Sequence, residues 1–356
     1  MASWTLVAAA CIALAAPARA AVELAGLEVY GTTRLTDQQA QARYGNAVAQ
    51  LVRLKARDTP NGRHAFDQAS RRMENDLVEK YGFVFARLSW SDFFADGKHK
   101  AFLDIDVVEP ADRAVRMPFK AAVRKSIPDP GGLLSQWTQY NDLGWRLFKS
   151  GELSISHNCL AAYCEWGTET PELKAYEERF VSLAKDHKEP LQKIVRLDKD
   201  PLKRASAVYL LAYLPDVQES AKLIEPGLDD PDAEVRTAAL KVYADYAAGH
   251  KEVSLPTEKI NAALDYPTAA DRNKAIAVVA GMASNPLHRR FLIMKAGSQI
   301  LKLMQSKEPS IADTAYAAIG ILSGETFKRE NSDAWRSWLT QARAHPEAPP
   351  AESPRR

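Results

Sequence analysis

The sequence brings two cysteines and a histidine close together, at Cys159, Cys164 and His157. The third cysteine, Cys11, lies in an apolar N-terminal run that we expect to be removed on export, so an even pair remains. In an oxidising compartment, a pair at this short spacing indicates a local disulfide that closes a small loop. The alternative is a metal site, but zinc usually takes four ligands and only three candidates are close here. We therefore expect a Cys159–Cys164 disulfide and no bound metal.

Other residue patterns that could support catalysis are missing from the sequence. No two of its histidines stand at the helical spacing typical of metal ligands, and no serine lies in a nucleophile elbow between glycines. Glycine-rich phosphate loops are absent as well. The carboxylate pair Asp229 and Asp230 lies at an expected helix start, where the helix dipole favours negative charge. We predict no catalytic residues, no cofactor and no enzymatic activity.

Aromatic residues gather shortly before the cysteine pair. Trp137, Tyr140 and Trp145 belong to an apolar stretch that predicts a short helix after a linker rich in proline and glycine. They could line a ligand pocket, or they could fill a small core beneath the cysteine loop. Core packing is the interpretation that we expect.

A recurring arginine marks an internal repeat in the C-terminal half. Three segments that begin with aspartate and proline each continue to an arginine, at Arg204, Arg236 and Arg272, so that the intervals are 32 and 36 residues. A fourth, more divergent copy begins at Glu308 and Pro309 and lacks the arginine. Periods of this size are typical of stacked supersecondary units.

Each copy is expected to form two helices. In the second copy, we place an N-cap at Asp230 and the first helical position at Pro231, and apolar residues then follow at the three-and-four spacing of one helical face. The Asp-Pro start, the Val235–Arg236 pair and the alanine-rich inner face resemble HEAT repeats over about residues 189–322. The resemblance implies an α-solenoid, which we expect over 169–343. HEAT solenoids occur in scaffolds, transport factors, pigment lyases and DNA repair enzymes, so the resemblance implies no single function.

Arg236, Asp271, Arg272 and Asn273 form a candidate partner-binding surface within these repeats. In the HEAT family, such an arginine usually ties its helix to an aspartate of a neighbouring loop, and the polar residues from Asp271 onward could cap the helix that begins there. We favour these structural roles. At the C-terminal end, Trp335 and Trp338 would share one helical face and pack on the last repeat.

The region 21–110 follows a different pattern. A short strand ending at Tyr30 and two helices precede two stretches of alternating residues, and the second stretch places Asp104 and Asp106 opposite its apolar face. The order strand, helix, helix, strand, strand, with Gly31 after the first strand and Val107 to Pro110 closing the last, resembles a POTRA domain. The resemblance implies an envelope protein that binds extended segments through a sheet edge. A generic small α+β domain explains the same pattern.

The remaining segments complete the expected organisation. Residues 1–20 predict a signal peptide cleaved after Ala20, residues 111–168 a linker and a cysteine-containing helical segment, and residues 344–356 a disordered, proline-rich tail. No later stretch approaches the roughly 20 apolar residues that span a bilayer, so we expect no stable membrane insertion. The protein should therefore be periplasmic or secreted.

Charge completes the sequence-based prediction. The formal net charge is only +2 and the two signs are interspersed, which argues against a nucleic-acid ligand because phosphate binding needs a basic surface. We expect a mainly α-helical protein that serves as an exported, non-enzymatic interaction scaffold or adaptor, with another envelope protein as its partner. The alternative is an enzyme or pigment-handling lyase with its site in the solenoid groove or near His157, Cys159 and Cys164.

Overall fold

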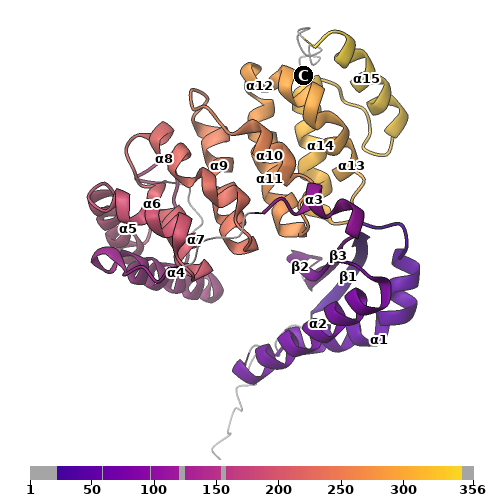
Figure 1. The fold of residues 1–356 in the computed structure, drawn as a ribbon, viewed down its shortest axis with the longest axis horizontal. Coiled ribbons are helices and arrows are strands. Elements are labelled where there is room, and N and C mark those ends of the chain that lie inside the picture. The colour runs from indigo at the N-terminus through magenta and orange to yellow at the C-terminus, as the bar shows by residue number, and fades with distance from the viewer. Residues whose placement is uncertain (1–21, 58, 97, 120–124, 154–157, 347–356) are drawn as a thin grey trace, which may run out of the picture.

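The computed structural model describes residues 22–57, 59–96, 98–119, 125–153 and 158–346 (Figure 1). The chain is mainly helical and has one small three-stranded sheet near its N-terminus. The expected signal peptide, His157 and the segment from residue 347 onward lie outside the described ranges. Within those ranges, no helix combines the length and the apolar character that crossing a membrane requires.

Residues 23–108 form a compact α+β unit with the predicted order of elements. Its elements are β1 (Glu23–Tyr30), α1 (Asp37–Lys55), α2 (Pro60–Tyr81), β2 (Phe85–Ala95) and β3 (Lys98–Val108). Strand β3 is central, parallel to β1 and antiparallel to β2. Local signals fix the helix ends: Thr36 and Gln39 form a capping box at the start of α1. Gly82 ends α2 with a φ of 67°, a conformation that glycine adopts at low cost.

Strand β3 is buried on both faces. Leu103, Ile105 and Val107 belong to a core shared with α1 and α2. Asp104 and Asp106 alternate with them and are also fully buried, because the opposite face of the strand lies against the C-terminal helices. The alternation predicted a polar outer face here, and packing against a second part of the chain covers it.

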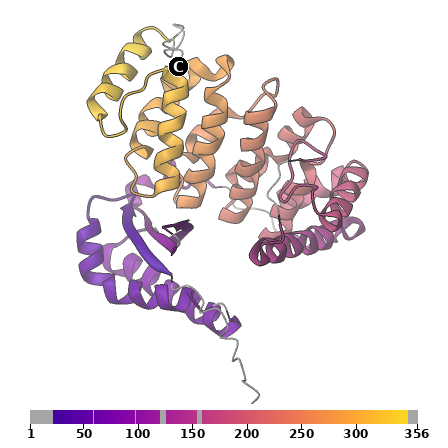
Figure 2. The same ribbon diagram turned by 180° about the vertical axis from the view of Figure 1, so that it is seen from behind.

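A connecting segment leads from β3 along the helices to the opposite end of the molecule (Figures 1 and 2). Its described elements are the 3₁₀ helix η1 (Pro110–Asp112), α3 (Arg113–Arg116), the 3₁₀ helix η2 (Pro130–Gly132) and α4 (Leu133–Ser150). Arg116 anchors its start by donating to the carbonyl oxygens of Val107 and Asp265. Farther along, the ring of Phe119 lies under the guanidinium of Arg236 at 3.9 Å.

The C-terminal part is a curved, two-layered array of helices (Figure 1). In one layer α7 packs on α9, α9 on α11 and α11 on α14, and the shorter helices cover them from the other side. The first layer comprises α7 (Pro201–Leu211), α9 (Ala233–Gly249), α11 (Ala269–Ala283) and α14 (Pro309–Ser323). The remaining helical elements are α5 (Pro171–Leu183), α6 (Lys188–Leu197), α8 (Val217–Ile224), the 3₁₀ helix η3 (Glu225–Asp229), α10 (Thr257–Ala263), α12 (Pro286–Phe291), the π-helical turn η4 (Leu292–Ala296), α13 (Gly297–Leu303) and α15 (Ser332–Ala344).

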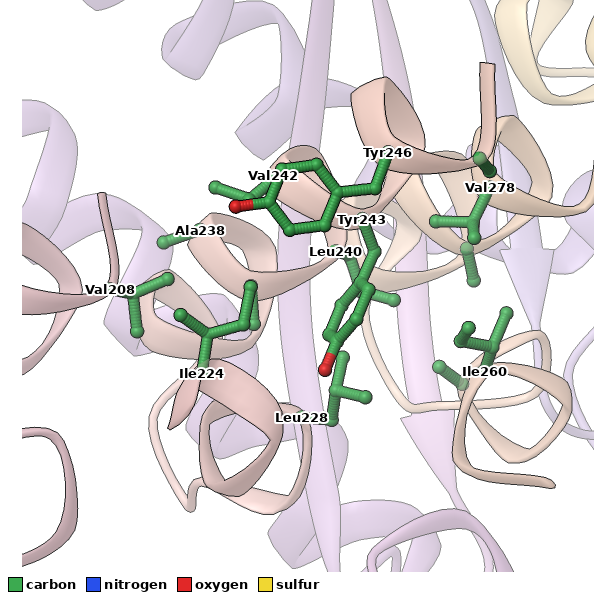
Figure 3. Close-up of a cluster of buried hydrophobic side chains, with 14 of the residues drawn as sticks. Val208, Ile224, Leu228, Ala238, Leu240, Val242, Tyr243, Tyr246, Ile260 and Val278 are labelled. Carbon is green, nitrogen blue, oxygen red and sulfur yellow. The ribbon is translucent and has the colours of Figure 1, made fainter. Parts of the chain in front are cut away.

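One continuous core runs through this array. Figure 3 shows its centre, where Val208 of α7, Ile224 of α8 and Tyr243 of α9 lie close to one another. Each fully buried aliphatic side chain of this kind contributes about 1.5–3 kcal/mol. Trp335 of α15 is completely buried and Trp338 is packed partly against the core, so both close the array as the sequence predicts. Tyr30 of the α+β unit belongs to the same core, which makes the two parts one packed body.

Candidate binding groove and the junction beside it

Two of the recurring arginines tie neighbouring repeats together. Arg204 makes a bidentate pair with Asp230, with both nitrogen–oxygen distances at 2.7 Å. Arg236 pairs in the same way with Asp271, at 3.0 and 2.7 Å. All four side chains are almost completely buried. The structural role expected for these arginines is therefore present.

The pairing also corrects the predicted start of α9. Because Asp230 accepts hydrogen bonds from Arg204, its side chain does not cap the helix. The helix begins at Ala233, and Asp232 provides the N-cap by accepting from the amide of Glu234. The first and fourth copies follow the prediction, since α7 and α14 begin at Pro201 and Pro309.

The third arginine crosses from the array to the α+β unit. Arg272 Nη2 donates to Asp106 Oδ1 at 2.7 Å, and the guanidinium lies 3.6 Å from the centre of the Tyr30 ring. The second oxygen of Asp106 accepts from Ser89 Oγ at 2.6 Å and from the amide of Ala269 at 2.8 Å. Arg204 and Arg236 each pair with an aspartate of the next repeat. For Arg272, strand β3 provides the aspartate instead.

This arrangement corrects the candidate partner-binding surface. Arg236, Asp271 and Arg272 have exposed fractions of 2%, 0% and 1%, so a partner cannot contact them. Their charges are satisfied within the chain. Asn273 is partly exposed and donates to Ser310. The N-cap of α11 is Thr268, whose hydroxyl accepts from the amide of Asp271 at 3.2 Å.

Asp104 is the exception among these matched charges. Neither of its carboxylate oxygens has a hydrogen-bond partner in the part of the chain that the structure describes, and Arg272 Nη2 lies 4.0 Å away. Burial raises the pKa of Asp104 well above its usual range, and the neighbouring Asp106 raises it further. The alternating pattern of β3 did not indicate that Asp104 is buried, because a carboxylate on an alternating strand normally faces water.

A groove opens between the first layer of the array and helix α4. Its volume is about 370 Å³, and it is lined by side chains of α4, α7, α9 and α11 together with Glu165, which directly follows Cys164. The walls combine aromatic rings with charged groups; among them are Trp137, Trp145, Tyr209, Glu165, Lys241 and Lys274.

The aromatic wall of the groove rests on a stack of rings. Tyr209 stacks on Trp137 with 4.8 Å between ring centres and on Tyr163 with 5.5 Å. Trp137 is 4% exposed and Trp145 is 46% exposed, so the second ring is the accessible one. Tyr140 lies in the core instead. Trp137 and Tyr140 are thus buried, as the core-packing interpretation predicts, and Trp145 lies half-exposed on the groove.

Of the two lysines that line the groove, one forms an ion pair with a described residue and the other does not. Lys241 Nζ lies 2.5 Å from Glu165 Oε1, and Tyr163 donates to the other oxygen of Glu165. Lys274, two residues after Arg272 on α11, lines the groove and has neither a hydrogen bond nor an ion pair with any described residue. Desolvation lowers the pKa of Lys274 and repulsion from Lys241 lowers it further, while attraction by Glu165 acts in the opposite direction. Sequence reasoning did not single out Lys274.

The cysteine loop, residues 159–164, lies beside the groove, because its Tyr163 stacks on Tyr209 and Glu165 follows it directly. Cys159 and Cys164 are joined by a disulfide, with 5.4 Å between their Cα atoms, as their spacing predicts. Because both sulfurs are bonded to each other, the pair offers no thiolate for a metal. Throughout the described ranges, no three histidine, cysteine, aspartate or glutamate side chains are grouped as metal ligands.

A buried carboxyl group supports the helices behind the aromatic wall. Glu177 of α5 is fully buried and accepts from the hydroxyl groups of Tyr140 and, at 2.9 Å, Tyr213. Its second oxygen has no partner among the described residues. Burial raises the pKa of Glu177 to about 7, although both tyrosine hydrogen bonds act in the opposite direction.

Comparison with known proteins identifies no relative: no protein-family model matches the chain, and neither a curated protein nor a solved structure is significantly similar to it.

Proposed function

We propose that this protein is an exported, non-enzymatic scaffold of the bacterial envelope, in which a HEAT-type α-solenoid and a POTRA-like domain together hold another protein. The observation that carries the proposal is the groove on the first layer of the array. It presents the half-exposed ring of Trp145 to solvent, and aromatic side chains are enriched where proteins contact a partner.

The chemical nature of the groove favours binding over catalysis. Its lining includes no histidine and no cysteine, and Glu165 is already paired with Lys241. A general base needs a nucleophile or substrate proton within hydrogen-bond reach, and no such pair is formed by the lining side chains. Stacked helical repeats, in contrast, commonly present a continuous surface to another chain.

The disulfide supports the proposed location. Disulfides persist in oxidising compartments and are rare in the bacterial cytosol, so Cys159–Cys164 favours a periplasmic or secreted protein. The apolar run near the N-terminus is consistent with export.

A pull-down from native envelope extract tests the proposal. The bait is residues 21–356, and mass spectrometry identifies the proteins and small molecules that it retains. Thr237→Trp fills the groove at a partly exposed lining position, and Thr340→Trp adds the same ring at an exposed site on α15 as the matched control.

We expect one specific envelope protein to be retained by the unmodified chain and by Thr340→Trp, and to be lost with Thr237→Trp. Retention that is indifferent to Thr237→Trp would place the interaction elsewhere on the surface. A bait that carries a stoichiometric metal or pigment and no protein would overturn the scaffold proposal in favour of a lyase or enzyme.

A further inference from the structure

We propose that Asp104 makes the contact between the α+β unit and the helical array sensitive to pH, so that the unit is released from the array when this buried carboxyl group loses its proton. We call this contact the junction. The inference does not depend on the proposed function, because Asp104 and the residues around it do not line the groove.

The charge of Asp104 is unmatched at the junction. Asp104 is completely buried, and neither of its oxygens has a hydrogen-bond partner among the described residues. Arg272 Nη2 lies 4.0 Å from Asp104 Oδ1 but only 2.7 Å from Asp106 Oδ1. The Nη1 atom of the same guanidinium donates to backbone carbonyl oxygens. Arg272 therefore neutralises Asp106 and leaves Asp104 without a partner of its own.

The other elements around Asp104 bring repulsion or neutral groups. Glu28 is its register partner on β1, Glu308 caps the start of α14, and both carboxylates repel an ionised Asp104. On β2, Ser89 lies opposite Asp104 but donates to the other aspartate. Burial raises the pKa of Asp104 most, and the surrounding carboxylates raise it further against the attraction of the guanidinium. The closed junction therefore holds Asp104 in its uncharged form.

Most of the remaining junction is polar. Among the described residues of the α+β unit, Tyr30 alone belongs to the core of the array, while the unit has a separate core between its sheet and its helices. The hydroxyl of Tyr30 donates to Asp265 at 2.7 Å, and Lys307 of the loop before α14 pairs with Asp37 at 2.5 Å. Each part keeps its own core when the junction opens, so a charge on Asp104 acts on the contact rather than on either fold.

Opening of the junction is coupled to proton release. In the open form the carboxyl group of Asp104 is exposed to water and ionises with an ordinary pKa of about 3.9, whereas the closed form keeps the proton to a higher pH. Over the range in which only the closed form is protonated, the ratio of open to closed junctions rises by up to about tenfold per pH unit. Outside that range Asp104 contributes no pH dependence.

Hydrogen exchange measures this opening, because backbone amides of the array donate to carboxylates of the α+β unit. The amide of Ala269 donates to Asp106 at 2.8 Å, and the amide of Lys307 donates to Glu28 at 3.1 Å. Exchange of both amides in residues 21–356 is followed by mass spectrometry at about pH 5 and about pH 8. Each rate is divided into the rate of an unstructured peptide at the same pH, which gives a protection factor free of the intrinsic effect of base.

We expect both protection factors to fall by about fivefold or more between these pH values, relative to their change in Asp104→Asn, which does not titrate. Asp112→Asn is the matched control, because it neutralises an exposed aspartate of η1 and should keep the full fall. The amides of Val48 in α1 and Tyr243 in α9 report on the two cores and should stay better protected than the junction amides.

Three results would overturn the inference. A fall of equal size in Asp104→Asn would assign the pH dependence to another group. A fall at Ala269 without one at Lys307 would show fraying of the first turn of α11 instead of release of the unit. Junction amides that are protected as well as those of Val48 and Tyr243 would show that the junction opens only when the whole chain unfolds.

Discussion

Two parts of the chain cover the helical array in different ways. Beside α11 and α14, the α+β unit contacts the array through charges, with Arg272 and Asp106 at the centre. At the N-terminal end of the array, α4, α5 and the cysteine loop close it through aromatic rings packed around Glu177. We call these contacts the ionic closure and the aromatic closure. Each contains a buried carboxyl group that lacks hydrogen-bond partners among the described residues, at both oxygens of Asp104 and at one oxygen of Glu177.

The difference shows how each closure fixes position. A guanidinium and a carboxylate must meet in one geometry, so the ionic closure sets the orientation of the α+β unit on the array. Further contacts on the same side agree with this role, such as Tyr30 donating to Asp265 at 2.7 Å and Lys307 meeting Asp37 at 2.5 Å. Aromatic rings accept a range of angles, and those near α4 are tilted, stacked or edge-on. The aromatic closure therefore forms a packed wall, and Trp137 and Trp145 of this wall line the groove.

The largest expected effect comes from breaking the ionic closure with Asp106→Ala. This change leaves Arg272 buried without its carboxylate, and removing one member of a buried pair costs about 3–5 kcal/mol. Urea unfolding should show the loss directly. Ser89→Ala removes only one hydrogen bond to the same carboxylate and should cost about 1 kcal/mol. Equal losses in the two variants would show that Arg272 finds another partner.

The sequence predicted the elements of both closures but not the contact that makes either one. The order of the α+β unit, the helix starts at Pro201 and Pro309, and the disulfide follow from local spacing, and all are present. The pairing of Arg272 with Asp106 joins residues 166 positions apart, and no local pattern encodes such a distance. For the same reason the sequence could not show that Arg236, Asp271 and Arg272, offered as a candidate partner-binding surface, are buried, because burial depends on what packs above a residue.

The next largest effect concerns Glu177 in the aromatic closure. Because burial raises its pKa to about 7, the folded protein keeps a proton that the unfolded chain releases above its ordinary pKa of 4.5. The free energy of unfolding should therefore fall as the pH rises from about 4.5 to about 7, by about 3 kcal/mol in total, and change no further from this group at higher pH.

Unfolding in urea at about pH 5 and about pH 8 measures this dependence. Glu177→Gln keeps the shape and can still accept from Tyr140 and Tyr213, but it does not titrate, so the difference between the two pH values should shrink by that amount. An unchanged pH dependence in Glu177→Gln would assign the effect to another group.

A smaller effect is expected from opening the disulfide that holds the end of the aromatic closure. The bond closes a short loop of five-residue separation, and the chain-entropy model assigns such a loop about 2 kcal/mol. A Cys159→Ser, Cys164→Ser double variant should lose that amount in urea unfolding. A double variant as stable as the unmodified chain would show that the stacking of Tyr163 on Tyr209 holds this loop without the bond.

The smallest effect, and the one that separates the two closures most clearly, is a gain from Asp104→Asn. Within the array, Arg204 and Arg236 each pair with one aspartate. In the ionic closure, two aspartates, Asp104 and Asp106, lie near the single Arg272. Asp104 is also repelled by Glu28 and Glu308. Removing its charge should raise the free energy of unfolding at about pH 8 by about 1 kcal/mol, in the range of one buried polar interaction. At about pH 4 the gain should be smaller, because the raised pKa of Asp104 already keeps it protonated in the folded state.

Asp271→Asn is the matched control, since that carboxylate accepts two hydrogen bonds from Arg236 and its neutralisation should destabilise the protein at both pH values. If Asp104→Asn were destabilising as well, the charge of Asp104 would stabilise Arg272. The ionic closure would then resemble the arginine–aspartate pairs within the array.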